Sequence, residues 1–238
     1  MAATRLISKT AVVCLLFASA LLNAPETLAA GELLEPSVYH AEEVSAKVGK
    51  GQPWLGLFQT KAGKYELKQT KLVVTLVNDP IVDDKPEQKT GKKISIVGMG
   101  EPIVLVRGIS GLKAGRVTGN DLKKEHMPAG QTHELRLGAK VANLIVTGKK
   151  KDEDITRDYK VVLESGGVKQ ELYKRAELGS DGCPSLLWSG DLDGDGKIDL
   201  IMDMTDHYNV RKVTLLLSGK AKSGKLVEQV AFIEATGC

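Results

Sequence analysis

The segment from Gly190 to Met204 reads Gly-Asp-Leu-Asp-Gly-Asp-Gly-Lys-Ile-Asp-Leu-Ile-Met-Asp-Met. Its first part is rich in Asp and Gly, which is typical of a tight loop. In its second part apolar residues occupy every second position from Ile198 to Met204, which predicts a strand with one apolar face. The segment therefore predicts a loop that leads directly into a β-strand and not into a helix.

Short alternating or apolar runs of the same kind continue through most of the chain. The predicted strands are Trp54–Thr60, Tyr65–Gln69, Leu72–Val77, Lys93–Val97, Ile103–Arg107, Gly115–Thr118, His133–Leu137, Ala142–Thr147, Ile155–Glu164, Val168–Arg175, Ser185–Ser189, Ile198–Met204, Val210–Leu217 and Leu226–Glu234. Evidence for a helix is limited to Glu35–Val48, where a short helix and a β-rich structure both fit the apolar spacing. Many short strands at regular spacing predict an all-β fold of antiparallel sheets, arranged as a sandwich or a barrel.

Alternation within two of these strands also predicts which side chains share a face. Tyr159, Val161 and Leu163 are expected on one face of their strand. In the last strand, Val230 and Phe232 are expected on one face together with Leu226 and Glu228.

Composition excludes several classes of protein. The chain has 238 residues, 42% of them apolar, three cysteines, and a net charge of +3 from 33 basic and 30 acidic residues. The apolar fraction excludes a disordered chain, and the cysteines are too few for a disulfide-rich miniprotein. A net charge this small gives no argument for binding to nucleic acid.

Residues 1–30 have the pattern of a secretory signal peptide. A short basic region precedes an apolar run from Ala11 to Leu22, and small residues predict cleavage after Ala29 or Ala30. The run is too short to span a membrane, and no later stretch is long enough, so we expect no membrane span in the mature chain. The predicted location is the periplasm or the cell exterior.

Two cysteines, Cys183 and Cys238, remain after the signal peptide is removed. In an oxidising compartment they predict one disulfide, which would join the end of the chain to the start of the Asp-rich segment. The charged block Lys149–Asp154 is a solvated turn, and we expect it to divide an N-terminal β region, 31–150, from a C-terminal β region, 151–238.

The Asp-rich loop predicts a metal site. Counted from Asp191, carboxylates occupy positions 1, 3, 5 and 9, which are Asp191, Asp193, Asp195 and Asp199. Carboxylates packed this closely repel one another without a cation, and Ca²⁺ accepts six to eight oxygen ligands in flexible geometry. We expect these four side chains as ligands, with the backbone carbonyl of Lys197 and its ammonium pointing away. Mg²⁺ is the second choice because it demands stricter geometry, and Zn²⁺ is disfavoured because no His or Cys is present.

The loop followed by a strand resembles the FG-GAP or VCBS-type repeat over about Leu187 to Leu217. The resemblance includes the Asp-rich core and a second strand, Val213–Leu217, after the Thr205–Asn209 turn. It implies a β-hairpin with Ca²⁺ bound in the loop that leads into it. The motif occurs once in this chain, so a full propeller is not expected.

Three other groups of residues are candidate sites. His126 and His133 flank a turn-like segment, where a metal pair competes with solvated turn histidines, and His207 lies at the tip of the expected hairpin. Trp54 and Trp188 lie in apolar strands, which favours core packing over sugar stacking. No catalytic motif for a serine hydrolase, a zinc protease or a P-loop enzyme is present.

We therefore expect an exported, calcium-binding β protein that acts as a non-enzymatic binding or structural module, with a cell-surface glycan or protein as its partner. One alternative is a secreted hydrolase of polysaccharide that uses calcium structurally. Another is an envelope accessory protein that binds a second protein through its β surface.

Overall fold

The computed structural model describes residues 31–237, with gaps at 41, 46–47, 50–52, 62–63, 99 and 121–124. The expected signal peptide, residues 1–30, lies outside the described residues, as does Cys238. The described chain forms strands and two short 3₁₀ helices, η1 (Ser180–Gly182) and η2 (Ser218–Lys220), with no α-helix. In this part of the chain no helix has the length and apolarity needed to cross a membrane. The all-β prediction is confirmed.

The strands in chain order are β1 (Glu32–Leu34), β2 (Val38–Tyr39), β3 (Trp54–Lys61), β4 (Lys64–Thr70), β5 (Leu72–Val77), β6 (Gly91–Ile96), β7 (Leu105–Arg107), β8 (Gly115–Gly119), β9 (Glu125–His126), β10 (Thr132–Leu137), β11 (Lys140–Lys150), β12 (Ile155–Ser165), β13 (Val168–Gly179), β14 (Ser185–Asp191), β15 (Asp199–Asp203), β16 (Val210–Leu217) and β17 (Glu228–Thr236).

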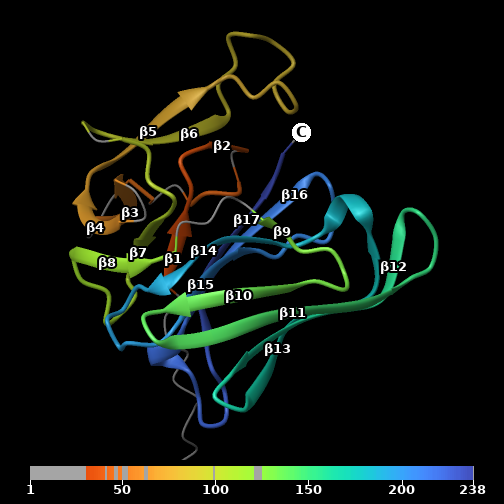
Figure 1. The fold of residues 1–238 in the computed structure, drawn as a ribbon. Helices are drawn as coiled ribbons and strands as arrows, with labels where there is room; N and C mark the ends of the chain where they lie inside the picture. The colour runs from red at the N-terminus through yellow and green to blue at the C-terminus, as the bar shows by residue number, and fades with distance from the viewer. Residues whose placement is uncertain are drawn as a thin grey trace, which may run out of the picture.

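The largest sheet is antiparallel and nearly closes into a barrel (Figure 1). Its strand order is β1-β7-β3-β4-β8-β14-β15-β16-β17, with β9 paired to β14. At the two ends of this order the Gly31 amide donates to the Val230 carbonyl at 3.0 Å, which brings β1 beside β17. Because the strands curl around a common interior and form no blades, the fold is not a propeller.

Two smaller antiparallel sheets cover the outside of this barrel-like sheet. Strands β10-β11-β12-β13 form one, and β2-β6-β5 form the other. In Figure 1 the β5–β6 hairpin lies at the top of the molecule, and the β10–β13 sheet lies across its lower right. Strands β11 and β12 pair directly across the charged turn, so the boundary expected near residue 150 falls inside one sheet and does not separate two regions.

Three hydrophobic cores lie between these layers. The first fills the interior of the barrel-like sheet and includes Leu57, Trp188 and Ile201. The second lies between the β10–β13 sheet and the outer face of β14–β16, and the third lies under the β2-β6-β5 sheet. Strand β15 has Ile201 in the interior core and Leu200 in the second core. Its five residues are all buried for this reason.

Each predicted strand overlaps an observed one, and the expected faces are confirmed in part. Tyr159, Val161 and Leu163 are all at most 2% exposed. Phe232 is 47% exposed and lies under the Lys212 ammonium, 5.2 Å away. The prediction that Phe232 shares a face with Val230 is wrong. Leu215 of β16 pairs with Ala231 and Leu216 pairs with Gln229, so β17 has one extra residue at Val230, and the alternation of its side chains reverses at that point.

The segment 35–48 is not helical where it is described. It contains the two-residue strand β2, followed by turns. Tyr39 donates from its hydroxyl to the Glu35 carbonyl at 3.0 Å and is buried in the third core together with Val44 and Val48. The apolar spacing therefore reflects contacts with that core and not one stripe of a helix.

Both tryptophans pack in cores, as predicted. Trp54 is 3% exposed and Trp188 is not exposed at all. Trp188 makes an edge-to-face contact with Tyr65, with ring centroids 5.8 Å apart. A Cβ on Gly190 would lie 2.3 Å from the Thr118 carbonyl oxygen and 2.5 Å from the Trp188 ring. Glycine at 190 therefore lets β14 approach β8 over the indole.

We predict that Gly190→Ala destabilises the protein by about 1–3 kcal/mol, because backbone or indole must move to admit the methyl group. Urea unfolding followed by tryptophan fluorescence measures the change in the free energy of unfolding. The matched control is Gly100→Ala, where a Cβ would meet nothing within 4 Å. Equal stability of Gly190→Ala and the parent protein would contradict this account of the β8–β14 contact.

Candidate metal centre

The Asp-rich segment forms the connection between β14 and β15. Asp191 is the last residue of β14 and Asp199 is the first of β15, so the loop leads into a strand as predicted. Gly194 and Gly196 adopt φ values of 79° and 74°, in the left-handed region that glycine tolerates best. These two glycines allow the chain to turn back on itself within seven residues.

The loop brings three carboxylates together. Oxygens of Asp191, Asp193 and Asp195 all lie within 4.8 Å of one another, and this is the one group of three or more possible metal ligands in the described chain. Backbone amides hold each carboxylate. Gly196 donates to Asp191 Oδ2 at 3.1 Å, Asp195 donates to Asp193 Oδ1 at 3.1 Å, and Lys197 donates to Asp195 Oδ1 at 2.8 Å. The side chains are therefore oriented by the loop itself.

One oxygen of this group has no partner. Asp191 Oδ1 is buried and accepts no hydrogen bond from any described residue. A buried carboxylate oxygen without a donor or a cation is costly. Burial raises the pKa of Asp193, and the negative charges of Asp195 and Asp191 raise it further. The donor set is purely oxygen, which fits Ca²⁺ or Mg²⁺ better than Zn²⁺.

Asp199 lies apart from this group and supports the loop from beneath. It is fully buried, and its Oδ2 accepts from the Leu192 amide at 2.6 Å and the Asp193 amide at 3.2 Å. Its Oδ1 accepts from the amide and the hydroxyl of Ser218, at 2.7 and 2.8 Å. Burial raises the pKa of Asp199 to about 7, although these hydrogen bonds partly oppose the rise. Both oxygens are thus engaged by the protein, and Asp199 as a direct metal ligand stays a prediction.

Helix η2 forms the opposite wall of the candidate centre, and the sequence motif gave no signal for it. The Ser218 hydroxyl lies 2.9 Å from Asp195 Oδ1 and 2.8 Å from Asp199 Oδ1. It has one proton, so it cannot donate to both carboxylates at once. The Gly219 amide donates to Asp193 Oδ2 at 3.2 Å. These contacts join residues about twenty positions apart in sequence, which local spacing does not predict.

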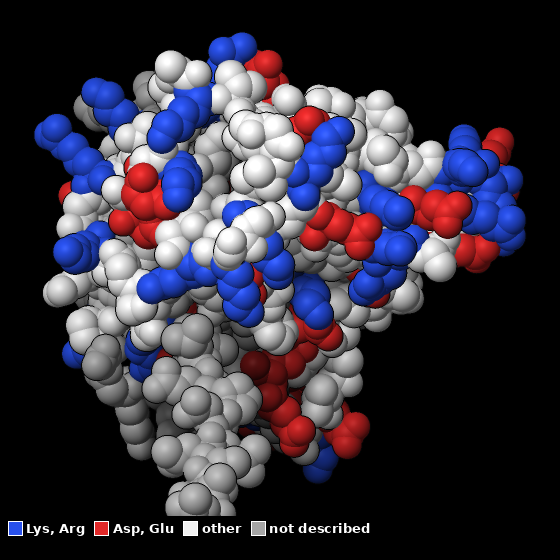
Figure 2. Space-filling view, turned by 90° about the horizontal axis from the view of Figure 1, so that it is seen from below, with Lys and Arg blue, Asp and Glu red and all other residues white. Residues whose placement is uncertain are grey.

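Two lysines approach the loop. The Lys197 ammonium lies 3.6 Å from Asp195 Oδ2, so the expectation that it points away is wrong, because the exposed chain folds back toward the carboxylates. The Lys140 ammonium, at the start of β11, donates to the Gly196 carbonyl. Lys140 therefore links the loop to the β10–β13 sheet. Figure 2 shows Asp and Glu side chains in several separate groups on the face seen from below, with Lys and Arg side chains between them.

The histidines are not part of this group. His126, on β9, lies 3.2 Å through its Nδ1 from the Ser185 hydroxyl, and His133 faces Leu144 across the β10–β11 pair. His207 Nδ1 contacts the Asn209 side chain, and its ring lies 4.6 Å from that of Tyr208, which is 69% exposed. No cluster of metal ligands includes a histidine within the described ranges.

Cys183 follows η1 and is half-buried, and burial raises the pKa of its thiol. No disulfide joins described residues, and its predicted partner, Cys238, lies outside them. The predicted pairing is therefore neither confirmed nor contradicted.

Comparisons with protein-family models, curated proteins and solved structures found no match for this chain.

We predict that the metal-free protein loses stability as pH rises from about 4 to about 7. The pKa of Asp199 is raised from 3.8 to about 7 in the folded state, so the folded protein keeps a proton that the unfolded chain releases over this range. The free energy of unfolding, measured in urea with a chelator present, should fall across this range. In Asp199→Asn the fall should be much smaller.

The control for this titration is Asp84→Asn, which removes an exposed carboxylate of the 78–90 loop. It should keep the slope of the parent protein. An Asp199→Asn variant with the same pH dependence as the parent would show that Asp199 is already ionised at pH 4 in the folded state.

Proposed function

We propose that this chain is an exported, calcium-binding β protein that acts as a non-enzymatic binding or structural module, with a cell-surface glycan or protein as its partner. The observation that carries the calcium proposal is the buried, unpartnered Oδ1 of Asp191 beside two further carboxylates. A cation in contact with this oxygen would supply its missing partner and offset the repulsion among the three side chains.

Calcium is favoured because the three clustered side chains offer only oxygen atoms, and these lie within 4.8 Å of one another. Asp191, Asp193 and Asp195 are the central ligands in this proposal. The Lys197 carbonyl and Asp199 complete the set predicted from the sequence. These five groups leave the remaining positions of a six- to eight-coordinate calcium to water or to second carboxylate oxygens, in the irregular geometry that calcium accepts, whereas magnesium retains its waters and requires an octahedron.

The contacts around the loop suggest a structural clamp. The loop is joined to η2 through Ser218 and Gly219, and to the β10–β13 sheet through Lys140. An ion held in this loop would connect the barrel-like sheet, helix η2 and the β10–β13 sheet. Extracellular calcium modules commonly bind at about 10⁻⁴–10⁻³ M, so the ion would stabilise the fold by about 1 kcal/mol at millimolar calcium.

We predict that millimolar Ca²⁺ raises the melting temperature of the purified chain and that excess chelator reverses the rise. Isothermal titration calorimetry should detect one site per chain. Asp191→Asn and Asp193→Asn should each weaken binding by at least about tenfold, because each removes a charged oxygen ligand. The exposed Asp84→Asn is the matched control.

Magnesium at the same concentration should produce a smaller shift in melting temperature than calcium. An unchanged melting curve in both ions, with no heat of binding, would overturn the proposal. Binding that persists unchanged in both loop variants would place the ion elsewhere.

Export is proposed from the signal-like pattern of residues 1–30, and the neighbours of both cysteines are compatible with a disulfide. The Gly237 amide donates to the Asn209 carbonyl at 2.9 Å. A Cβ on Gly182 would lie 2.7 Å from backbone atoms of Asp206. The residues that precede Cys183 and Cys238 therefore contact the same loop, between β15 and β16.

We predict that the chain purified from the exported fraction begins after Ala29 or Ala30 and contains one disulfide. Its intact mass should fall by two hydrogens relative to the reduced chain, and a peptide map should recover Cys183 linked to Cys238. Cys183→Ser should lose this peptide and melt at a lower temperature, since the bridge closes a loop of more than fifty residues. Two alkylatable thiols in the unreduced exported chain would contradict the pairing.

A further inference from the structure

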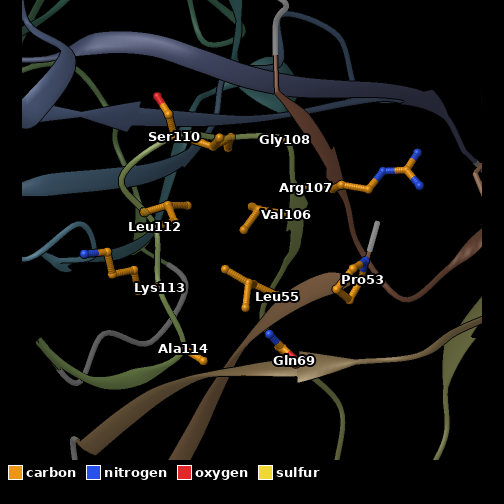
Figure 3. A pocket seen from close by; sticks show the side chains of 11 residues that line it. Pro53, Leu55, Gln69, Val106, Arg107, Gly108, Ser110, Leu112, Lys113 and Ala114 are labelled. Carbon is orange, nitrogen blue, oxygen red and sulfur yellow. The ribbon is translucent and has the colours of Figure 1, made fainter. Parts of the chain in front are cut away.

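A cavity of about 630 Å³ opens at one end of the barrel-like sheet (Figure 3). It lies between β3, β4 and β7 on one side and the loop of residues 108–114 on the other. It is lined by eleven residues, among them Leu55, Gln69, Val106, Ser110, Leu112 and Lys113. Neither the candidate metal centre nor any predicted site residue lies in it.

The floor of the cavity is an extension of the interior core. Leu55 pairs with Gln69 on β4 and with Val106 on β7, so the three side chains lie on the same face of the sheet. Val106 is buried in the interior core, and Leu55 and Leu112 pack against it. In Figure 3, Leu55, Val106 and Leu112 point toward one another across the cavity. The floor is therefore apolar, with Leu55 and Val106 supplied by β3 and β7 and Leu112 by the loop of residues 108–114.

The rim of the cavity is basic. None of the eleven lining residues is acidic, whereas Arg107 and Lys113 are both cations. Arg107 is held away by Glu32 and lies 4.6 Å over the Trp54 ring, and its side chain points out of the cavity in Figure 3. Lys113 is exposed. Lys220 adds a second ammonium, which donates to the Ser110 hydroxyl of the same loop at 2.8 Å.

We propose that this cavity binds an amphipathic monocarboxylate with an apolar alkyl chain. The alkyl chain would lie on the floor formed by Leu55, Val106 and Leu112, and the carboxylate would lie at the rim near Lys113 and Lys220. The volume is within the range of small-ligand pockets, which occur preferentially in the mouths of β-barrels. This inference goes beyond the proposed calcium site and does not depend on it.

The lining also argues against other classes of ligand. A cation would meet the Lys113 ammonium and no carboxylate among the described lining residues, which is unfavourable. A peptide would bury its backbone amide groups in the cavity, which is costly where they find no hydrogen-bond partner. Gln69 and Ser110 are the only uncharged polar side chains in the described lining. An apolar chain with one anionic end matches both the floor and the rim.

The test titrates the purified full chain with dodecanoate, below the concentration at which micelles form, by isothermal titration calorimetry. Across octanoate, decanoate and dodecanoate the affinity should rise roughly fourfold per added methylene that reaches the floor. Dodecan-1-ol should bind more weakly than dodecanoate, and dodecyltrimethylammonium weaker still. Raising the salt concentration should weaken the binding of dodecanoate and leave the affinity for dodecan-1-ol nearly unchanged.

Lys113→Glu should weaken dodecanoate binding by about tenfold and leave dodecan-1-ol unchanged, because it places a like charge at the rim. Lys89→Glu, at an exposed lysine of the 78–90 loop, is the matched control and should bind as the parent does. Ala114→Trp should abolish binding of the carboxylate and the alcohol alike by filling the cavity. If that variant does not fold, Lys113→Glu still decides the outcome.

Three results would overturn the proposal. The first is no heat of binding with any carboxylate in the series. The second is dodecanoate affinity that is the same in Lys113→Glu and in the parent, which would place the binding elsewhere on the protein. The third is equal or tighter binding of dodecyltrimethylammonium, which would exclude an anion site.

Discussion

Strand β15 has to satisfy two hydrophobic cores at once, and most of the structure is arranged around this constraint. Leu200 and Met202 face the β10–β13 sheet, and Ile201 faces the interior of the barrel-like sheet. A strand buried on both faces has no solvent side on which to place polar residues. The two polar residues at its ends, Asp199 and Asp203, are accordingly buried and fully engaged, Asp199 by backbone amides and Ser218, and Asp203 by Arg211 and the Lys212 amide.

The strands differ in how well the sequence predicts them. Strands with several apolar positions, such as β5 and β16, were located to the residue because period and burial agree in them. Strands β1, β2 and β9 have two or three residues each, and their pairing depends on partners that are distant in sequence. The face of Phe232 was missed because a register shift is set by packing between strands, which alternation alone does not contain.

The candidate metal centre was predictable in part for a similar reason. The curl that brings Asp191, Asp193 and Asp195 together depends on local spacing and on glycine at 194 and 196. The wall supplied by η2 is non-local, and so is the burial that gives Asp199 a role in holding the loop. In the structure, the carboxylates of Asp191, Asp193 and Asp195 lie close to one another, whereas the Asp199 carboxylate accepts hydrogen bonds from backbone amides. Sequence spacing alone does not distinguish these two roles.

Helix η2 contacts two different parts of the molecule within three residues. Gly219 reaches the Asp193 carboxylate, and Lys220 reaches Ser110 in the loop beside the cavity. One residue inserted within this turn would displace both contacts at once, so its length is fixed by two neighbours. The exposed stretch that follows, around Lys222 to Lys225, carries Gly224 in open space. For protein engineering, that stretch is the place to graft a tag or a recognition peptide, while 218–220 should be left intact.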